Sequence, residues 1–217
     1  MRRVLRAAAV ALCAGALIPA VAEAGTFQEI TVEAGGQDVF SPDQSSGEVN
    51  VDNLFRWSWG AGTINQHNVR QDSKLFYSGA ISDDHAPFDV IASAGTYHYY
   101  CDLHGTRSGG MDGEVAVSPR LSPLARKRGF DPVVSVEWAS QSTATGDQFD
   151  VQYKVGSGDW KYWRKNTSKL GGLFGNNGKP VTVKKGKTYR IWARSEKSSN
   201  PTKRSGWSPA LLFGLTR

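Results

Sequence analysis

Four side chains that can bind a transition metal occur in one restricted pattern. Cys101, His104 and Met111 lie within a single short stretch, and His67 lies well upstream of them. A thiolate and two imidazoles, with a thioether as a weak axial ligand, form the donor set of blue-copper electron-transfer sites. The sequence therefore predicts one copper site made of His67, Cys101, His104 and Met111.

The residues before the cysteine indicate how it is positioned. Tyr97 to Cys101 is rich in residues that favour strands, and side chains alternate between the two faces of a strand. Cys101 then shares a face with Tyr97 and Tyr99, whereas His98 points to the opposite face. We expect this strand to deliver Cys101 at its end, pointing towards the core, and to keep His98 out of the site.

The segment after Cys101 is expected to be a ligand loop. His104 and Met111 are separated by six residues, and a strand is expected at 114–117. His67 should come from a separate hairpin, so the sheets would set the angle between the two halves of the site. Glycine permits the tight reversals that such a loop needs, and three glycines are available: Gly105, Gly109 and Gly110.

Several alternatives compete with this interpretation. His85 could replace His67, although its neighbours Asp83, Asp84 and Pro87 are typical of a solvated loop. The backbone carbonyl of Gln66 or a water could replace Met111 as the axial ligand. Cysteine and histidine also bind zinc, but methionine is a poor zinc ligand. Multicopper oxidase and nitrite reductase chemistry needs more histidines than the sequence has, so we do not expect an enzyme.

The segment from 64 to 117 resembles a known family. It contains His-Asn-Val, then Ala-Gly-Thr-Tyr, then Tyr-Tyr-Cys-x-x-His-Gly, and finally Gly-Met-x-Gly before a strand. These motifs, in this order, resemble the plastocyanin-like cupredoxins. The resemblance implies a Greek-key β-sandwich over 25–118 that binds one type 1 copper ion through His67, Cys101, His104 and Met111. It also implies a hydrogen bond from Asn68 across the ligand loops. Two departures are the longer spacing before the methionine and an aspartate directly after the cysteine.

The first 24 residues are expected to be a secretory signal peptide. Arg2, Arg3 and Arg6 precede an apolar run, and Ala22-Glu23-Ala24 is typical of a cleavage site. Arg2-Arg3 leaves twin-arginine export open beside the general route. The apolar run is too short for a stable membrane span, and none is expected after cleavage. We therefore expect a periplasmic, cell-surface or secreted protein.

The single cysteine that remains after cleavage, Cys101, would be a metal ligand rather than an exposed free thiol.

Charge divides the rest of the sequence into two parts. Residues 25–118 contain four Lys or Arg and thirteen Asp or Glu, whereas residues 119–217 contain nineteen Lys or Arg and six Asp or Glu. A segment with two prolines and a basic run lies at the change of sign. The sequence therefore predicts one domain over 25–118, the part that resembles the cupredoxins, a linker over 119–129 and a second domain over 130–217.

Both domains are expected to be all-β sandwiches, because short apolar or alternating runs recur between turn residues. Those of the second domain lie at 133–138, 149–155, 160–163, 181–184 and 189–194, with turns at 156–159 and 176–178. This domain resembles an immunoglobulin-like fibronectin type III module. Trp138 and Trp192 are expected in its core, Trp160, Trp163 and Trp207 partly exposed, and Tyr189 is expected to be a corner tyrosine.

Two functions are consistent with these patterns. The first is exported transfer of single electrons through Cu(I)/Cu(II), with the acidic domain steering a basic redox partner such as a cytochrome or an oxidase domain. The second is a copper-carrying or adhesion protein whose basic module binds an anionic envelope polymer or a protein. The basic surface could also only aid solubility or dock on the acidic domain. Export makes nucleic acid an unexpected physiological partner.

Overall fold

The computed structural model describes residues 27–60, 63–122, 132–141, 143 and 145–215. The expected signal peptide and residues 123–129 of the expected linker lie outside this part of the chain. Within it, regular structure is almost entirely β-strand, with one 3-10 turn at Ala34–Gly36. No described helix is long and apolar enough to cross a membrane. The all-β fold predicted from the sequence is confirmed.

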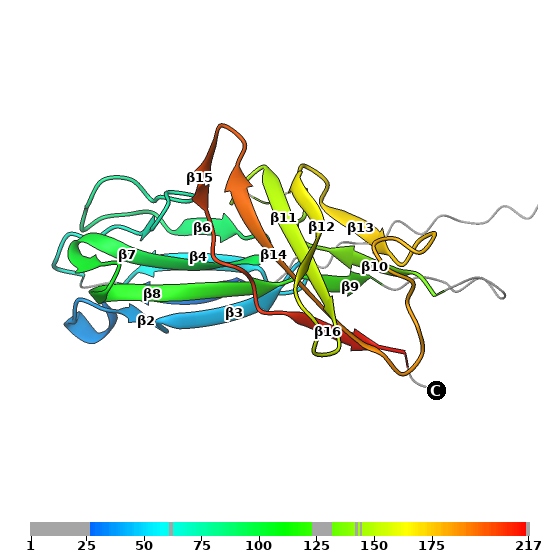
Figure 1. The fold of residues 1–217 in the computed structure, drawn as a ribbon. Coiled ribbons are helices and arrows are strands. Elements are labelled where there is room, and N and C mark those ends of the chain that lie inside the picture. Colours follow the sequence, from blue (N-terminus) through cyan, green and yellow to red (C-terminus); the bar gives the residue numbers. More distant parts are fainter. Residues whose placement is uncertain (1–26, 61–62, 123–131, 142, 144, 216–217) are drawn as a thin grey trace, which may run out of the picture.

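Two four-stranded sheets lie within residues 28–118, and we name this part of the structure the first domain (Figure 1). The first sheet has the order β2-β1-β4-β6, with strands Phe40–Ser41, Gln28–Val32, Leu54–Trp59 and Phe88–Ile91. The second has the order β3-β8-β7-β5, with strands Gln44–Glu48, Gly109–Ser118, Gly95–Thr106 and Arg70–Gln71. β1 runs parallel to β4 and β3 runs parallel to β8, so the chain crosses between sheets and does not simply meander.

Alternating side chains fill the space between these sheets. In β4, Phe55 and Trp57 are fully buried, while Arg56 lies on the outer face and binds Asp89 through two hydrogen bonds of 2.6 Å. The ring of Trp57 packs edge-on against Tyr99 of β7, with centroids 5.1 Å apart. This core fixes the register of β7, because a one-residue slip would turn its buried aromatic residues towards solvent.

The second domain also has two sheets. One has the order β13-β10-β9, with strands Gly171–Phe174, Val134–Glu137 and Arg120–Ser122. The other has the order β12-β11-β14-β15, with β16 also pairing with β14. Its strands are Lys161–Thr167, Gln148–Val155, Thr188–Lys197, Asn200–Arg204 and Leu211–Gly214. Residues 120–122 lie in the segment expected to be a linker, yet they form β9 and pair with β10. Residues 181–184, expected to be a strand, are not in one.

Two tryptophans of the second domain differ from expectation, because Trp163 lies in the core and Trp192 lies on the outer face. Trp163 is 8% exposed and packs edge-on against the buried Trp138, whereas Trp192 is only partly buried. The reason is the register of β14, in which Ile191 and Ala193 point inwards. Trp192 instead stacks between two partly exposed rings on the outer face, Trp160 at 3.8 Å and Trp207 at 5.2 Å.

Tyr189 and the expected turns lie as the sequence predicts. The Tyr189 hydroxyl accepts a 2.8 Å hydrogen bond from the Lys184 backbone amide, as in a tyrosine corner. Residues 156–159 connect β11 to β12. The turn at 176–178 has Asn177 and Gly178 at φ values of 51° and 70°, a conformation that asparagine and glycine tolerate.

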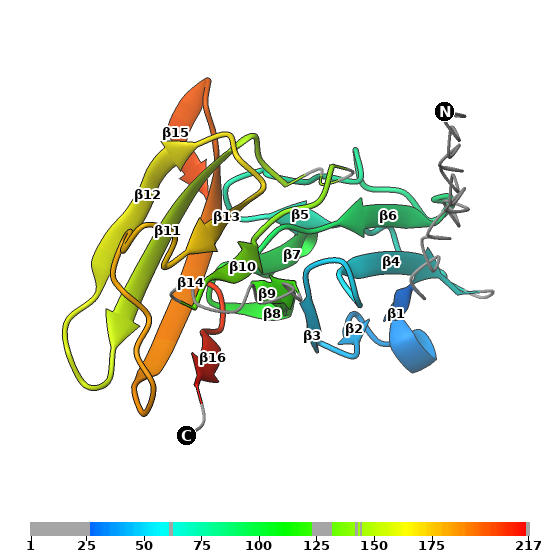
Figure 2. The same cartoon turned by 90° about the vertical axis from the view of Figure 1, so that its right-hand side faces the viewer.

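The two domains contact each other along the first residues of β7 (Figure 2). Thr96 and Gly206 exchange two backbone hydrogen bonds of 3.2 and 2.8 Å, and the Ala94 amide donates to the Trp138 carbonyl at 2.8 Å. The Tyr97 hydroxyl lies 2.9 Å from the Ser195 hydroxyl. The end of β7, which carries the predicted ligands Cys101 and His104, extends beyond this contact, away from the second domain (Figure 1).

Candidate metal centre

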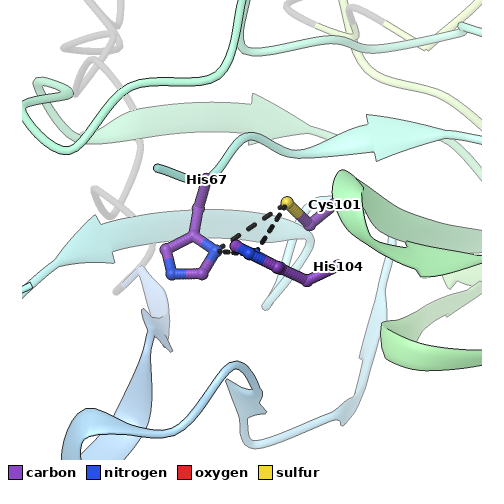
Figure 3. A group of neighbouring side chains, drawn as sticks. All are labelled: His67, Cys101 and His104. Carbon is purple, nitrogen blue, oxygen red and sulfur yellow. Dashed lines mark hydrogen bonds between the residues drawn. The ribbon is translucent and has the colours of Figure 1, made fainter. Parts of the chain in front are cut away.

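Three of the four predicted ligands converge on one point (Figure 3). Cys101 Sγ lies 3.8 Å from His67 Nδ1 and 3.9 Å from His104 Nδ1, and the two Nδ1 atoms are 3.0 Å apart. Cys101 and His67 are fully buried, while the side chain of His104 is 23% exposed. The site is therefore enclosed on the core side and reaches solvent through one imidazole.

β7 delivers the cysteine as the alternation predicts. Tyr97, Tyr99 and Cys101 are all 0% exposed and point into the core, whereas His98 lies on the other face. The ring nitrogens of His98 lie 3.1 Å from Asp72 and 2.9 Å from Asp112, outside the site.

The predicted ligand loop is wrong, because the segment is a β-hairpin. β7 continues to Thr106 and β8 begins at Gly109, so His104 and Met111 are strand residues. The pairing of β7 with β8 shifts register after Tyr100 and resumes at Gly105. This irregularity re-aims the end of the strand and lets His104 turn towards Cys101.

Two glycines make this close pairing possible. A Cβ on Gly105 would lie 2.1 Å from the Met111 carbonyl oxygen, and one on Gly110 would lie 2.5 Å from the His104 carbonyl oxygen. Gly110 also has a φ of 94°, which side chains disfavour. The glycines that suggested a loop therefore bring two strands together.

Met111 occupies a buried position in this hairpin. It is 1% exposed and follows Gly110, which pairs with Gly105 beside His104. Its buried place in β8 is compatible with an axial thioether, and that role stays a prediction.

Sequence reasoning missed two carboxylates behind His67. His67 Nε2 lies 3.1 Å from Glu33 Oε2 and 3.5 Å from Asp38 Oδ1. A partner on Nε2 leaves Nδ1 free to face Cys101. Burial lowers the pKa of His67, and the Glu33 contact only partly opposes this effect, so the imidazole is the neutral form that a metal requires.

Glu33 is itself held firmly. Its side chain is fully buried, and its carboxylate accepts hydrogen bonds from the backbone amides of Ile64 at 3.1 Å and Asn65 at 3.1 Å. Burial alone would raise the pKa of Glu33, but these amides and His67 outweigh it and lower the pKa below its ordinary value. Glu33 has a φ of 57° and follows β1. Glu33 lies 34 residues before His67, and no sequence pattern predicts that the two side chains meet.

The expected hydrogen bond between the segments that carry His67 and Cys101 is present, and a second hydrogen bond joins the same two residues, Asn68 and Asp102. The Asp102 amide donates to Asn68 Oδ1 at 2.8 Å, and Asn68 Nδ2 donates to the Asp102 carboxylate at 2.9 Å. Arg70 also binds this carboxylate at 2.7 Å. Burial would raise the pKa of Asp102, but Arg70 and Asn68 outweigh it and lower the pKa. The aspartate after the cysteine therefore strengthens the expected link.

His85 does not compete with His67. Its Nε2 lies 2.9 Å from the Ala80 carbonyl oxygen, and its ring contacts Trp59. Only His67 and His104 face Cys101 among the described histidines.

The donor set fits a metal ion of intermediate softness. Two imidazole nitrogens and a sulfur point at a common centre, where lone pairs would repel each other unless a proton or a cation lay between them. The only contacts of the Cys101 sulfur among described polar groups are the two imidazoles. Thiolate and imidazole donors suit copper and zinc.

Comparisons with known proteins give little further information. No family model matches the sequence, and no curated protein matches it significantly. Among solved structures, the chain is similar to the FN1–FN3 domains of chicken CNTN1, with 8% sequence identity and a TM-score of 0.30. The match covers 79% of this chain and 62% of that chain, so the chain spans less than two thirds of the solved structure.

Proposed function

We propose that this chain is an exported type 1 copper protein that carries single electrons between redox partners. Its first domain would be a cupredoxin and its second a fibronectin type III-like module. The observation that carries the proposal is the convergence of His67 Nδ1, Cys101 Sγ and His104 Nδ1 at a mostly buried point. Bound copper would supply one-electron exchange between Cu(I) and Cu(II).

The protein's part in this function is to hold the donors in one geometry. Glu33 fixes the ring of His67, and the Asn68–Asp102 pair joins the two ligand segments. Burial of Cys101 and His67 keeps water from the thiolate. A rigid, dry donor set changes little when the charge of the site changes, which favours rapid electron exchange.

Electrons would enter and leave near His104, the most exposed of the predicted ligands. Leu103, next to it in sequence, is 55% exposed, and Ile64, whose amide binds Glu33, is 76% exposed. These apolar side chains would exclude water from a contact with a partner. The excess of acidic residues in 25–118 would steer a basic cytochrome or oxidase domain in a salt-dependent encounter.

Copper suits the predicted set better than zinc. Zinc sites take four ligands from cysteine, histidine, carboxylate or water, and thioether is not among them. Glu33 approaches Nε2 of His67 and not the converging atoms, and the nearest other carboxylate, Asp38, has its Oδ1 3.5 Å from that Nε2 and 3.9 Å from His104 Nδ1. Met111 is the fourth ligand in the proposal.

The test is the visible and electron-paramagnetic-resonance spectrum of residues 25–217 loaded with Cu(II). We expect an intense thiolate-to-copper band and a narrow hyperfine splitting. Cys101→Ser should abolish the band and preserve the fold, while Met111→Leu should keep the band and shift the reduction potential. His85→Ala, which removes an imidazole outside the site, is the matched control and should change neither.

A colourless protein, or an ordinary tetragonal copper signal, would contradict the proposal and make binding by the second domain the leading function. Retention of the band in Cys101→Ser would remove that residue from the site. An unchanged potential in Met111→Leu would point to another axial group.

A further inference from the structure

The second domain has a groove that the electron-transfer function does not use. It has a volume of about 590 Å³ and lies between β12 and β13, the outermost strands of the two sheets. Trp163 and Arg164 of β12 line one side, and Gly171 to Leu173 of β13 line the other. The groove therefore runs along an open side of this β-sandwich.

β13 is an edge strand with few features that would prevent another strand from pairing with it. Among described strands it pairs only with β10, which leaves its other edge without a partner. Natural edge strands are usually guarded by charged residues or proline, but β13 has the sequence Gly-Gly-Leu-Phe. Leu173 is 43% exposed. Free backbone groups beside an exposed apolar side chain are the features that an added strand uses.

The groove is also strongly cationic. Arg164, Lys169 and Lys179 line it, and no acidic residue does. None of the three forms an ion pair or a side-chain hydrogen bond with a described residue. Arg164 Nε is buried and without a hydrogen-bond partner in the described structure. An occupant with negative charges would supply the missing partners.

The aromatic wall of the groove argues for a peptide rather than a glycan. A sugar ring stacks on an open aromatic face, but Trp163 is only 8% exposed. Its ring packs edge-on against Trp138 at 5.4 Å and Phe174 at 5.1 Å. Besides its charges, the groove exposes backbone groups of β13 and the apolar side chain of Leu173. A peptide can bind to both.

We propose that this groove binds an acidic peptide in extended conformation. The peptide adds to the free edge of β13 as a further strand, covers Leu173, and pairs its carboxylates with Arg164, Lys169 and Lys179. Backbone hydrogen bonds give affinity that does not depend on sequence, and the charges select acidic partners. This site does not rest on copper binding by the first domain.

The experiment measures fluorescence anisotropy of a labelled peptide of four Glu-Val repeats with residues 25–217 at near-physiological salt. We expect saturable binding, and no binding of the matching Lys-Val peptide. Lys169→Glu combined with Lys179→Glu should weaken binding roughly tenfold or more. The matched control, Lys184→Glu with Lys187→Glu, changes charge equally at exposed positions outside the groove and should weaken it less than about twofold. Circular dichroism checks that all variants are folded.

Two further probes test the mode of binding. A Glu-Val peptide methylated on every backbone nitrogen keeps its charge but loses its donors, so it should not bind. Equal binding of this peptide, or equal losses in the two double variants, would overturn the proposal in favour of a general charge effect. Absence of Glu-Val binding would overturn it too, and binding of a heparin oligosaccharide instead would assign the groove to a glycan.

Discussion

At the residue scale, Glu33 has the contacts that bear most directly on the candidate site. Metal-binding histidines commonly donate their second N–H to a carboxylate, which sets the tautomer and makes the imidazole a stronger donor. His67 has this arrangement at 3.1 Å, in full burial. If copper binds as proposed, the anion would also place negative charge behind it, and such charge would favour the more highly charged Cu(II) state.

Glu33→Gln tests this role while keeping the size of the side chain. We expect roughly 10- to 100-fold weaker copper affinity, because the outer partner of a ligand is lost. We also expect a higher reduction potential, because an anion that stabilises Cu(II) is removed. Competition titration and voltammetry measure the two effects. Asp38→Asn is the comparison, since Asp38 is 40% exposed and its Oδ1 lies 3.5 Å from the same nitrogen and 3.9 Å from His104 Nδ1. An equal effect there would show that Glu33 contributes no more than its neighbour.

His98 makes a pH-dependent contribution to stability outside the site. Burial alone would lower its pKa, but hydrogen bonds to Asp112 and Asp72 outweigh burial and raise the pKa above the ordinary value of 6.5. Arg107 also binds Asp72 at 2.9 Å. A group with a raised folded-state pKa stabilises fully below its unfolded pKa, and the contribution is lost as pH rises through the folded pKa.

His98→Gln should therefore destabilise the protein most below pH 6.5, and the difference from the unsubstituted protein should shrink as pH rises above that value. Denaturant unfolding of both proteins at several pH values measures the difference. A difference that grows with pH would reverse the assigned sign and exclude a protonated His98 between the two carboxylates.

At the scale of elements, period-two patterns are what the sequence predicts well. Tyr97, Tyr99 and Cys101 share the buried face that alternation assigns to them, because burial in a sandwich fixes strand register. The hairpin that carries His104 and Met111 was not predictable in this way. Its tip, residues 102–110, lacks the usual apolar alternation, and the strands pair there because Gly105 and Gly110 let two backbones approach closely.

Contacts between distant segments are the other part that could not be predicted. Glu33 reaches His67 because a turn with positive φ follows β1, and no local pattern encodes that meeting. Residue type predicts a core position for Trp192, but the register of β14 places it in an outer stack. The local sequence pattern thus predicts which face of a strand a side chain occupies and which residue types could bind a metal. The contacts between distant side chains depend on tertiary packing.

Gly105→Ala tests the role of backbone approach in the hairpin of β7 and β8 that carries His104 and Met111. The new methyl group would overlap the Met111 carbonyl oxygen, so the strands must separate. We expect a loss of stability of roughly 2 kcal/mol, as for overpacking of a tight contact, and a weaker thiolate-to-copper band. Denaturant unfolding of the metal-free protein and the visible spectrum measure these effects. Gly60→Ala adds its methyl group where no atom lies within 4 Å, and it should be nearly neutral.

At the scale of the whole molecule, the two domains share buried polar groups. The Tyr97 hydroxyl lies 2.8 Å from Ser93 Oγ in its own domain, and 3.0 and 2.9 Å from the hydroxyls of Thr145 and Ser195 in the other. Burial raises the pKa of Tyr97, so its hydroxyl stays protonated at neutral pH. The strand that carries Cys101 therefore begins inside the domain interface, and we expect the domains to unfold together.

Tyr97→Phe tests this coupling, because it removes the hydroxyl that pairs with the buried Ser195 hydroxyl across the interface, while Ser93 and Thr145 still bond to each other at 3.0 Å. We expect a loss of about 1–3 kcal/mol in the free energy of unfolding. Hydrogen exchange monitored separately in β4 of the first domain and β11 of the second should show the same loss in both, because one cooperative transition exposes both cores. Ser58→Ala is the control, since its hydroxyl binds Glu29 at an exposed site, and it should change little. If Tyr97→Phe accelerates exchange in β4 and leaves β11 unchanged, the domains open independently, and the second domain does not brace the ligand-bearing strand.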